Sequence, residues 1–161
     1  NDMELKPCNL DDLSTAKVSF AAGSLRSTLH AEVLVIKFIG KAANSREYHG
    51  TFSFMNAMIA AGVAAWSPFA VVLDLRQLSY EWGDEMSGTL TSAYDGDSRY
   101  SPPTAVVVSD LNREGLTSLV IQEMFASPED WLFDTVEDAI TAVDRRVDAQ
   151  RRNHGLGGLL G

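Results

Sequence analysis

Two short, almost unbroken apolar runs, each followed by a segment with helical periodicity, constrain the fold of this chain most. The runs are FAVVLDL at residues 69–75 and TAVVV at residues 104–108. Because neither run alternates between apolar and polar residues, each predicts a strand that is covered on both faces of its sheet. Helices that alternate with such strands are typical of a parallel or mixed sheet with right-handed crossovers. We therefore expect the two runs to be adjacent parallel strands.

The other elements give the predicted order β-β-α-β-α-β-α-(β)-α. Residues 17–25 and 32–39 predict two strands joined by a turn. Apolar residues at intervals of three and four between Tyr48 and Trp66 predict a helix. The later expectations are a short helix starting near Gly83, a loop at 95–103, a helix around 116–124 that ends before Pro128, a short strand at 131–133, and a last helix capped by Asp134 with Glu137. The fold class is α/β, with a mixed, mostly parallel sheet of four to five strands flanked by helices.

Length and composition indicate one globular domain. The 161 residues predict a polar arm at 1–14, a single domain at 15–152 and a Gly/Leu-rich flexible end at 153–161. The net charge of −9 argues against nucleic acid and against anionic membrane surfaces as partners. The single cysteine, Cys8, excludes an intramolecular disulfide, and we expect a cytoplasmic protein without a membrane span. The chain begins at Asn1 without an initiator methionine, which leaves an upstream segment open.

Several short motifs of the chain resemble the STAS domain, which is shared by bacterial anti-sigma factor antagonists and the tails of sulphate transporters. The run VVLDL at residues 71–75 is similar to the family's strand, and LSY at 78–80 is similar to the hydrophobic stretch that follows it. LFDTVEDA at 132–139 resembles the closing junction between strand and helix. The resemblance covers residues 17–152 and implies a non-enzymatic module for protein interaction or regulation.

The chain departs from the family at the site itself. The family opens its next helix with D-S-S/T-G, whose hydroxyl is phosphorylated by a partner kinase, and these positions fall on Trp82, Gly83, Asp84 and Glu85. Asp84 stands where the phosphorylated hydroxyl would be, and Ser79 and Ser87 lie nearby without occupying that position. Asp84 has two possible roles. It is either a helix cap, because a carboxylate in the first turn stabilises a helix by about 0.3–1 kcal/mol, or a permanent negative charge in place of a phosphate.

The resemblance implies that the region around Asp84 binds a protein partner, such as a regulator or a kinase-like protein. Tyrosine and tryptophan near this position favour the same interpretation, because both are common anchors in interfaces. The predicted partner-binding residues are Ser79, Tyr80, Glu81, Trp82, Asp84, Glu85 and Ser87.

Two other functions stay open. Asp74, Asp84 and Glu85 are the carboxylates that a small enzyme or a ligand-binding domain would use, since α/β sheets place ligands at the carboxyl ends of their strands. A structural homo-oligomer, or a homodimer of the interaction module, is the other alternative. The acidic residues of segment 81–97 do not match a calcium loop, and the chain has no recognisable catalytic or metal-ligand spacing. We therefore predict no catalytic residues, no metal and no cofactor.

Overall fold

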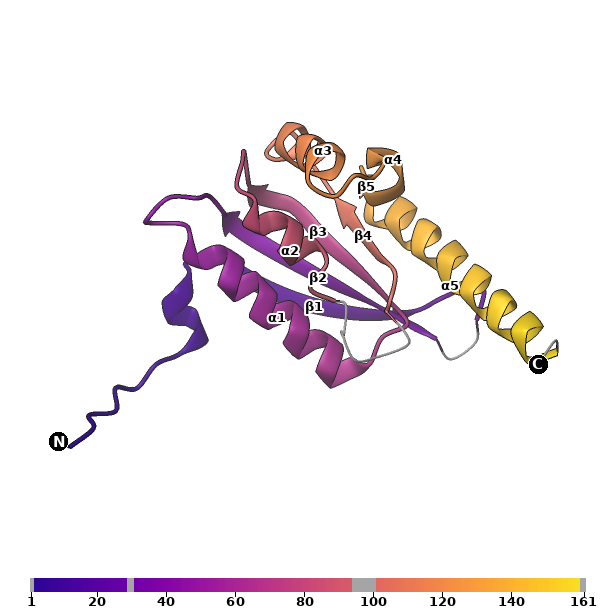
Figure 1. Ribbon diagram of the computed structural model, residues 1–161, viewed down its shortest axis with the longest axis horizontal. Helices are drawn as coiled ribbons and strands as arrows, with labels where there is room; N and C mark the ends of the chain where they lie inside the picture. The colour runs from indigo at the N-terminus through magenta and orange to yellow at the C-terminus, as the bar shows by residue number, and fades with distance from the viewer. Residues whose placement is uncertain (1, 29–30, 94–100, 160–161) are drawn as a thin grey trace.

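The computed structural model describes residues 2–28, 31–93 and 101–159, which form one five-stranded sheet with helices around it (Figure 1). The elements in chain order are η1 (Leu10–Leu13), β1 (Lys17–Ser24), β2 (Glu32–Lys41), α1 (Gly50–Trp66), β3 (Ala70–Ser79), α2 (Glu85–Leu90), β4 (Thr104–Val107), α3 (Arg113–Gln122), α4 (Pro128–Trp131), β5 (Leu132–Phe133) and α5 (Val136–Leu159).

The sheet has the strand order β1-β2-β3-β4-β5. β1 and β2 form an antiparallel hairpin, and every other neighbouring pair is parallel. β3 pairs with β4 in the register Val71↔Thr104 to Asp74↔Val107, which confirms the prediction that the two apolar runs are adjacent parallel strands. The predicted fold class, a mixed and mostly parallel sheet with flanking helices, is confirmed as well.

Two apolar cores form because successive side chains of a strand point to opposite faces of the sheet. On one face, Leu73 and Leu75 of β3 pack in a cluster with residues of α1, α2 and α3 such as Met55 and Leu116. On the other face, Val72 of β3 packs in a cluster with residues of α5. Figure 1 shows α1 and α2 lying over the sheet and α5 running along its β4 side. The central strands are thus covered on both faces, as their unbroken apolar runs require.

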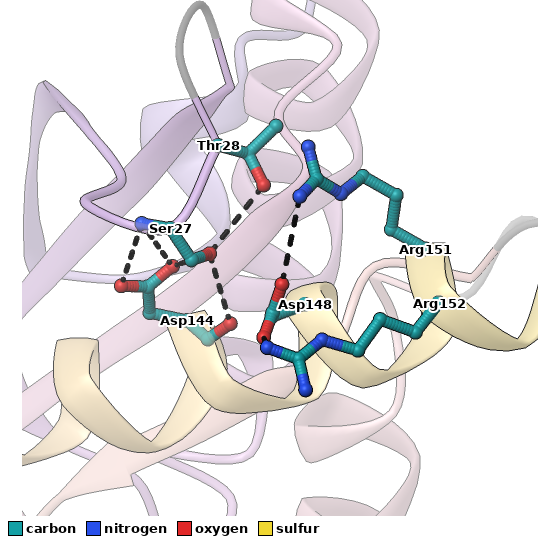
Figure 2. A network of polar contacts seen from close by, with 6 residues as sticks. All are labelled: Ser27, Thr28, Asp144, Asp148, Arg151 and Arg152. Carbon is teal, nitrogen blue, oxygen red and sulfur yellow. Dashed lines mark hydrogen bonds and ion pairs between the residues drawn. The ribbon is translucent and has the colours of Figure 1, made fainter. Parts of the chain in front are cut away.

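A polar network fastens α5 to the turn of the β1–β2 hairpin (Figure 2). Both carboxylate oxygens of Asp144 accept the backbone N–H of Ser27, each at 3.2 Å, and Oδ1 also accepts the Ser27 hydroxyl. One turn further along, the Asp148 carboxylate lies 2.9 Å from Nη2 of Arg152 and 3.7 Å from that of Arg151. The hairpin and the last helix, which are far apart in the sequence, are therefore joined by hydrogen bonds as well as by apolar packing.

Two helix boundaries differ from the sequence prediction. Pro128 begins α4 instead of ending the preceding unit, as proline does readily in a first helical turn, where its missing N–H has no intrahelical partner. The cap of α5 lies one residue later than predicted, because Thr135 Oγ1 accepts the N–H of Asp138 at 3.1 Å. Asp134 instead forms an ion pair with Arg113, with Oδ1 and Nη1 2.5 Å apart.

Two segments were predicted to lack regular structure, the chain end at 153–161 and the loop at 95–103. α5 continues to Leu159, so residues 153–159 are helical where a flexible end was predicted. Residues 101–103 of the predicted loop are irregular, whereas 95–100, with Asp95 and Asp97, lie outside the described residues. The boundaries 1–14, 15–152 and 153–161 stay predictions.

Candidate functional site

The residues predicted to bind a partner form one continuous segment at the carboxyl edge of the parallel strands; residues 79–87 are called the candidate segment. β3 reaches Ser79, four residues beyond the predicted end of the strand. Ser79 O accepts the N–H of Ala42 at 3.0 Å, and Tyr80 N–H donates to Leu111 O at 3.2 Å. The start of the segment is therefore held between the end of β2 and the loop before α3.

Tyr80 supports the segment from inside. Its side chain is buried, and its hydroxyl donates to Gly83 O at 2.9 Å. The Tyr80 and Phe52 rings pack in a T-shaped arrangement with centroids 6.4 Å apart. Gly83 has φ +140°, which side chains with a Cβ rarely adopt, and an added Cβ would lie 3.2 Å from Phe52 Cζ. Tyr80 is therefore a supporting residue for the loop and offers no exposed ring to a partner.

The rest of the candidate segment is turned outward. Trp82 is 61% exposed, and Glu81, Asp84 and Glu85 are exposed around it. Ser79 and Ser87 are half-buried. A large aromatic ring is thus exposed to solvent on a loop whose backbone is fixed at both ends. Such a ring, surrounded by charged groups, has the character of an interface anchor.

Asp84 does not cap α2 in the way its position suggests. It occupies the N-cap position, but its carboxylate makes no capping hydrogen bond to the helix that follows. The Asp84 backbone oxygen instead accepts the N–H of Ser87 at 3.1 Å and the Ser87 hydroxyl at 2.9 Å. The interpretation of Asp84 as a side-chain cap is therefore wrong, and its exposed charge is available to other groups.

Two grooves flank the candidate segment and share Tyr80 and Glu81 in their walls. The larger, about 440 Å³, runs toward α3, and Glu81, Asp110 and Glu114 are among its lining residues. The smaller, about 210 Å³, runs toward the end of β2 and is lined in part by Trp82 and Tyr48. Lys41 lies in its wall, with Nζ 4.9 Å from the centroid of the Tyr48 ring. The larger groove carries three acidic residues and thus favours a basic partner surface.

The acidic character of the site acts on Tyr80. Burial of the hydroxyl, followed by the charges of Asp84, Glu85 and Glu123, raises the pKa of Tyr80 to about 12. Tyr80 therefore keeps its proton at neutral pH and continues to donate it to Gly83 O. One of these charges has a local partner, because Glu85 Oε1 lies 3.3 Å from Nε2 of His49.

Asp74 lies on the other face of the sheet from Asp84 and Glu85. Successive side chains of β3 point to opposite faces of the sheet. The Asp74 side chain points to the same face as Val72, which packs against α5, whereas Leu73 points to the face that packs against α2. The carboxylate is bound by Arg76, with Nε to Oδ1 at 2.9 Å and Nη2 to Oδ2 at 2.8 Å. The geometry therefore does not bring together the carboxylates on which the enzyme alternative depends.

The ion pair of Asp74 predicts a specific dependence of stability on pH. Burial alone would raise the pKa of Asp74, but the hydrogen bonds from Arg76 and the charges of Arg76 and Lys37 lower it below its ordinary value of 3.8. A carboxyl with a lowered folded-state pKa adds stability above its unfolded-state pKa and loses it as pH falls through the folded-state pKa.

We expect Asp74→Asn to reduce the free energy of unfolding at neutral pH by about 1.5–3 kcal/mol, the range for hydrogen bonds to a charged group. The gap between wild type and variant should close as pH falls from 3.8 through the lower pKa of the folded state, because the folded wild-type carboxyl becomes neutral only there. Urea unfolding at a series of pH values measures the gap, and Arg76→Gln serves as the matched partner deletion. A gap that is the same at neutral and at acid pH would contradict the role given to the charge.

Two residues that position the candidate segment were missed by the sequence analysis. Asn112 is 2% exposed, and its Nδ2 donates to Leu75 O at 2.5 Å and to Leu78 O at 2.9 Å. Gly115 lets α3 approach the segment, since an added Cβ would lie 2.4 Å from Glu81 O. The only local signal was an asparagine just before a predicted helix, and that pattern indicates a cap, not a bond to a distant strand.

Within residues 2–28, 31–93 and 101–159, no three His, Cys, Asp or Glu side chains are grouped so that they could hold a metal ion. No helix in the same part of the chain is both long and apolar enough to cross a bilayer.

Comparison with known proteins identifies the fold. No protein-family model matches the sequence, and a search of curated proteins also found no match. Among solved structures, the chain is similar to the crystal structure of an anti-sigma factor antagonist from Mycobacterium paratuberculosis, with a TM-score of 0.50 and 20% sequence identity. The match covers 79% of this chain and 94% of that one. The chain therefore has a STAS-like fold, the fold of an anti-sigma factor antagonist.

Proposed function

We propose that this chain is a non-enzymatic protein-interaction module that acts as a regulator and binds its partner through the candidate segment. The observation that carries the proposal is the exposed Trp82, held among Glu81, Asp84 and Glu85 by a loop that Tyr80 and Phe52 support from below. A fixed aromatic ring inside a charged rim is the usual anatomy of a binding hot spot.

The chemistry of the segment favours a protein partner with a basic surface. The larger groove has three acidic residues in its walls, and Glu81 belongs to the segment as well, so this surface attracts positive groups and accelerates encounter with them. The structural neighbour is an anti-sigma factor antagonist, so the partner class to test first is an anti-sigma factor. We place this interaction in the cytoplasm.

Asp84 supplies a permanent charge at this surface. In the family that the sequence resembles, the corresponding hydroxyl gains negative charge by phosphorylation, whereas a carboxylate carries one charge at all times. The exposed Asp84 carboxylate makes no capping hydrogen bond, which supports an external role for it. A phosphate carries about −1.5 to −2 charges at neutral pH, so Asp84 would imitate the phosphorylated state only in part.

We expect Asp84→Ser to weaken binding to the anti-sigma factor about tenfold at low salt, because charge complementarity across an interface is lost. The loss should shrink at high salt, where exposed charges are screened. Stability should change by less than about 1 kcal/mol, since serine suits the N-cap position. Calorimetric titration of the purified anti-sigma factors of the source organism measures the affinity at two salt concentrations.

The matched control is Asp138→Ser, which removes an exposed carboxylate from the first turn of α5, on another part of the surface. It changes the net charge equally and should leave the affinity unchanged. Equal affinities of wild type and Asp84→Ser at both salt concentrations would refute the role of Asp84 as a fixed charge.

A further inference from the structure

The outer edge of β1 is an unprotected strand edge. Natural sheets blunt their edges with short strands, proline, bulges or inward charges. β1 is eight residues long, has the sequence KVSFAAGS, and pairs with β2 without a register shift. Its only charged residue is Lys17, at the start. The opposite edge of the sheet, β5, is only two residues long. Within the described residues, no backbone hydrogen bond joins β1 to any strand except β2.

The ladder defines which β1 groups face outward. Leu25 N–H donates to Ala31 O at 2.8 Å, so this pair is a hydrogen-bonded pair of the hairpin. Such pairs alternate along an antiparallel ladder. The N–H and C=O groups of Val18, Phe20, Ala22 and Ser24 therefore point away from β2. Glu32 confirms this alternation. It is paired with Ser24, and its backbone oxygen faces away from β1 and accepts the N–H of Phe69 at 2.9 Å.

We propose that β1 pairs antiparallel with β1 of a second copy of this chain, across a two-fold axis at Ala21. In this register Phe20 lies opposite Ala22 of the second copy, and Val18 lies opposite Ser24. All four outward-facing residues of each strand then find a partner, and each pair exchanges two hydrogen bonds. Registers centred on Phe20 or on Ala22 would leave one residue of each strand without a partner.

The side chains fit this symmetric pairing. On the face toward α1, the large Phe20 lies opposite the small Ala22, which leaves room for the Phe20–Trp66 ring pair, whose centroids are 5.1 Å apart. Trp66 is 46% exposed beside the edge and would lose part of that exposure. On the other face, the residues that meet are Ser19, Ala21 and Gly23, all exposed and small. A strand whose large residues oppose its own small residues is complementary to itself, as an isologous interface requires.

The charges of the molecule also favour this arrangement. The two lysines at position 17 lie at opposite ends of the paired strands, so no like charges meet in the ladder. The two β1 strands run in opposite directions. The carboxyl ends of the parallel strands β2 to β5 in one copy therefore point away from those in the other copy. The acidic candidate segments of the two copies therefore lie far apart, and the net charge of −9 on each copy is not concentrated at the contact. The eight-residue ladder spans about 27 Å.

Cysteine cross-linking tests the register. In the Cys8→Ser background, Ala21→Cys should form an intermolecular disulfide on mild oxidation, because the Cα atoms of a non-hydrogen-bonded pair lie about 4.5 Å apart, within the range of disulfides. Ser19→Cys is the matched control, since Ser19 lies opposite Gly23 of the other copy and should not cross-link. Cross-linking of both variants to the same extent, or of Ser19→Cys alone, would overturn the proposed register.

Sedimentation velocity tests the interface itself. The wild type should pass from monomer to dimer between roughly 1 and 200 µM, as expected for an interface near the small end of the size range. Ala22→Pro removes an outward N–H and leaves the hairpin ladder intact, so it should stay folded by circular dichroism and monomeric over the same range. A wild type that is monomeric throughout, or an Ala22→Pro variant that still dimerises, would overturn the proposal.

Discussion

Replacing Asn112 by aspartate should cost the folded chain about 3–5 kcal/mol, the range for leaving a buried polar group or charge without its partner. The two side chains have nearly the same shape, so packing is hardly changed. The amide Nδ2, however, donates to two backbone oxygens of β3, those of Leu75 and Leu78. A carboxylate has no proton to donate at neutral pH, and it would place a negative charge against both carbonyl oxygens at a position that is 2% exposed.

Urea unfolding of wild type and Asn112→Asp measures this cost as a lower transition midpoint at an unchanged slope. Asn56→Asp on α1 is the matched control, because Asn56 is exposed and the same chemical change there should alter stability by less than about 0.5 kcal/mol. A loss below about 1 kcal/mol for Asn112→Asp would mean that the amide does not hold the end of β3.

The fold could be predicted because its information is local. The strands at 69–75 and 104–108 are unbroken apolar runs, and α1 and α5 show the three-and-four spacing of an amphipathic helix. Each pattern directly reflects which faces of an element are covered. The order of these elements then limits the possible sheets to very few, because crossovers between parallel strands are right-handed. The hairpin and the pairing of β3 with β4 followed from these rules.

The details of the site could not be predicted, because they depend on contacts between distant parts of the chain. β3 continues past Leu75 with the polar residues Arg76 and Gln77, which pattern reasoning excludes from a buried strand. They are exposed in the structure, and Asn112 binds the carbonyl oxygens on either side of them. No local rule connects an asparagine to a strand more than thirty residues earlier.

Asp84 and Asp74 illustrate the same limit in opposite ways. A carboxylate at the start of a helix predicts a cap, but the hydrogen bonds at this position come from the backbone oxygen of Asp84, and its side chain stays exposed. An aspartate at the carboxyl end of an apolar strand predicts a functional group at the sheet edge, yet Asp74 lies inside β3 and is bound by Arg76 two residues away. In both cases the direction of the side chain, which residue type alone does not show, decided its role.

The second large effect is expected from Trp82→Ala, which should weaken binding to the anti-sigma factor by at least about 2 kcal/mol, roughly thirtyfold in Kd. An exposed tryptophan buries a large apolar area at low entropic cost when a partner covers it. Because Trp82 is 61% exposed in the free chain, its removal should hardly change the stability of the fold. A loss of affinity can then be assigned to the interface and not to unfolding.

Phe125→Ala is the matched control for this test. Phe125 is 89% exposed, in the turn after α3, and it lies outside both grooves beside the candidate segment. Its removal should leave the affinity unchanged, whereas any nonspecific hydrophobic association would weaken in both variants. The loss from Trp82→Ala should also persist at high salt, because apolar contacts are not screened, in contrast to the loss from Asp84→Ser. Equal affinities of wild type and Trp82→Ala would place the partner surface elsewhere on the molecule.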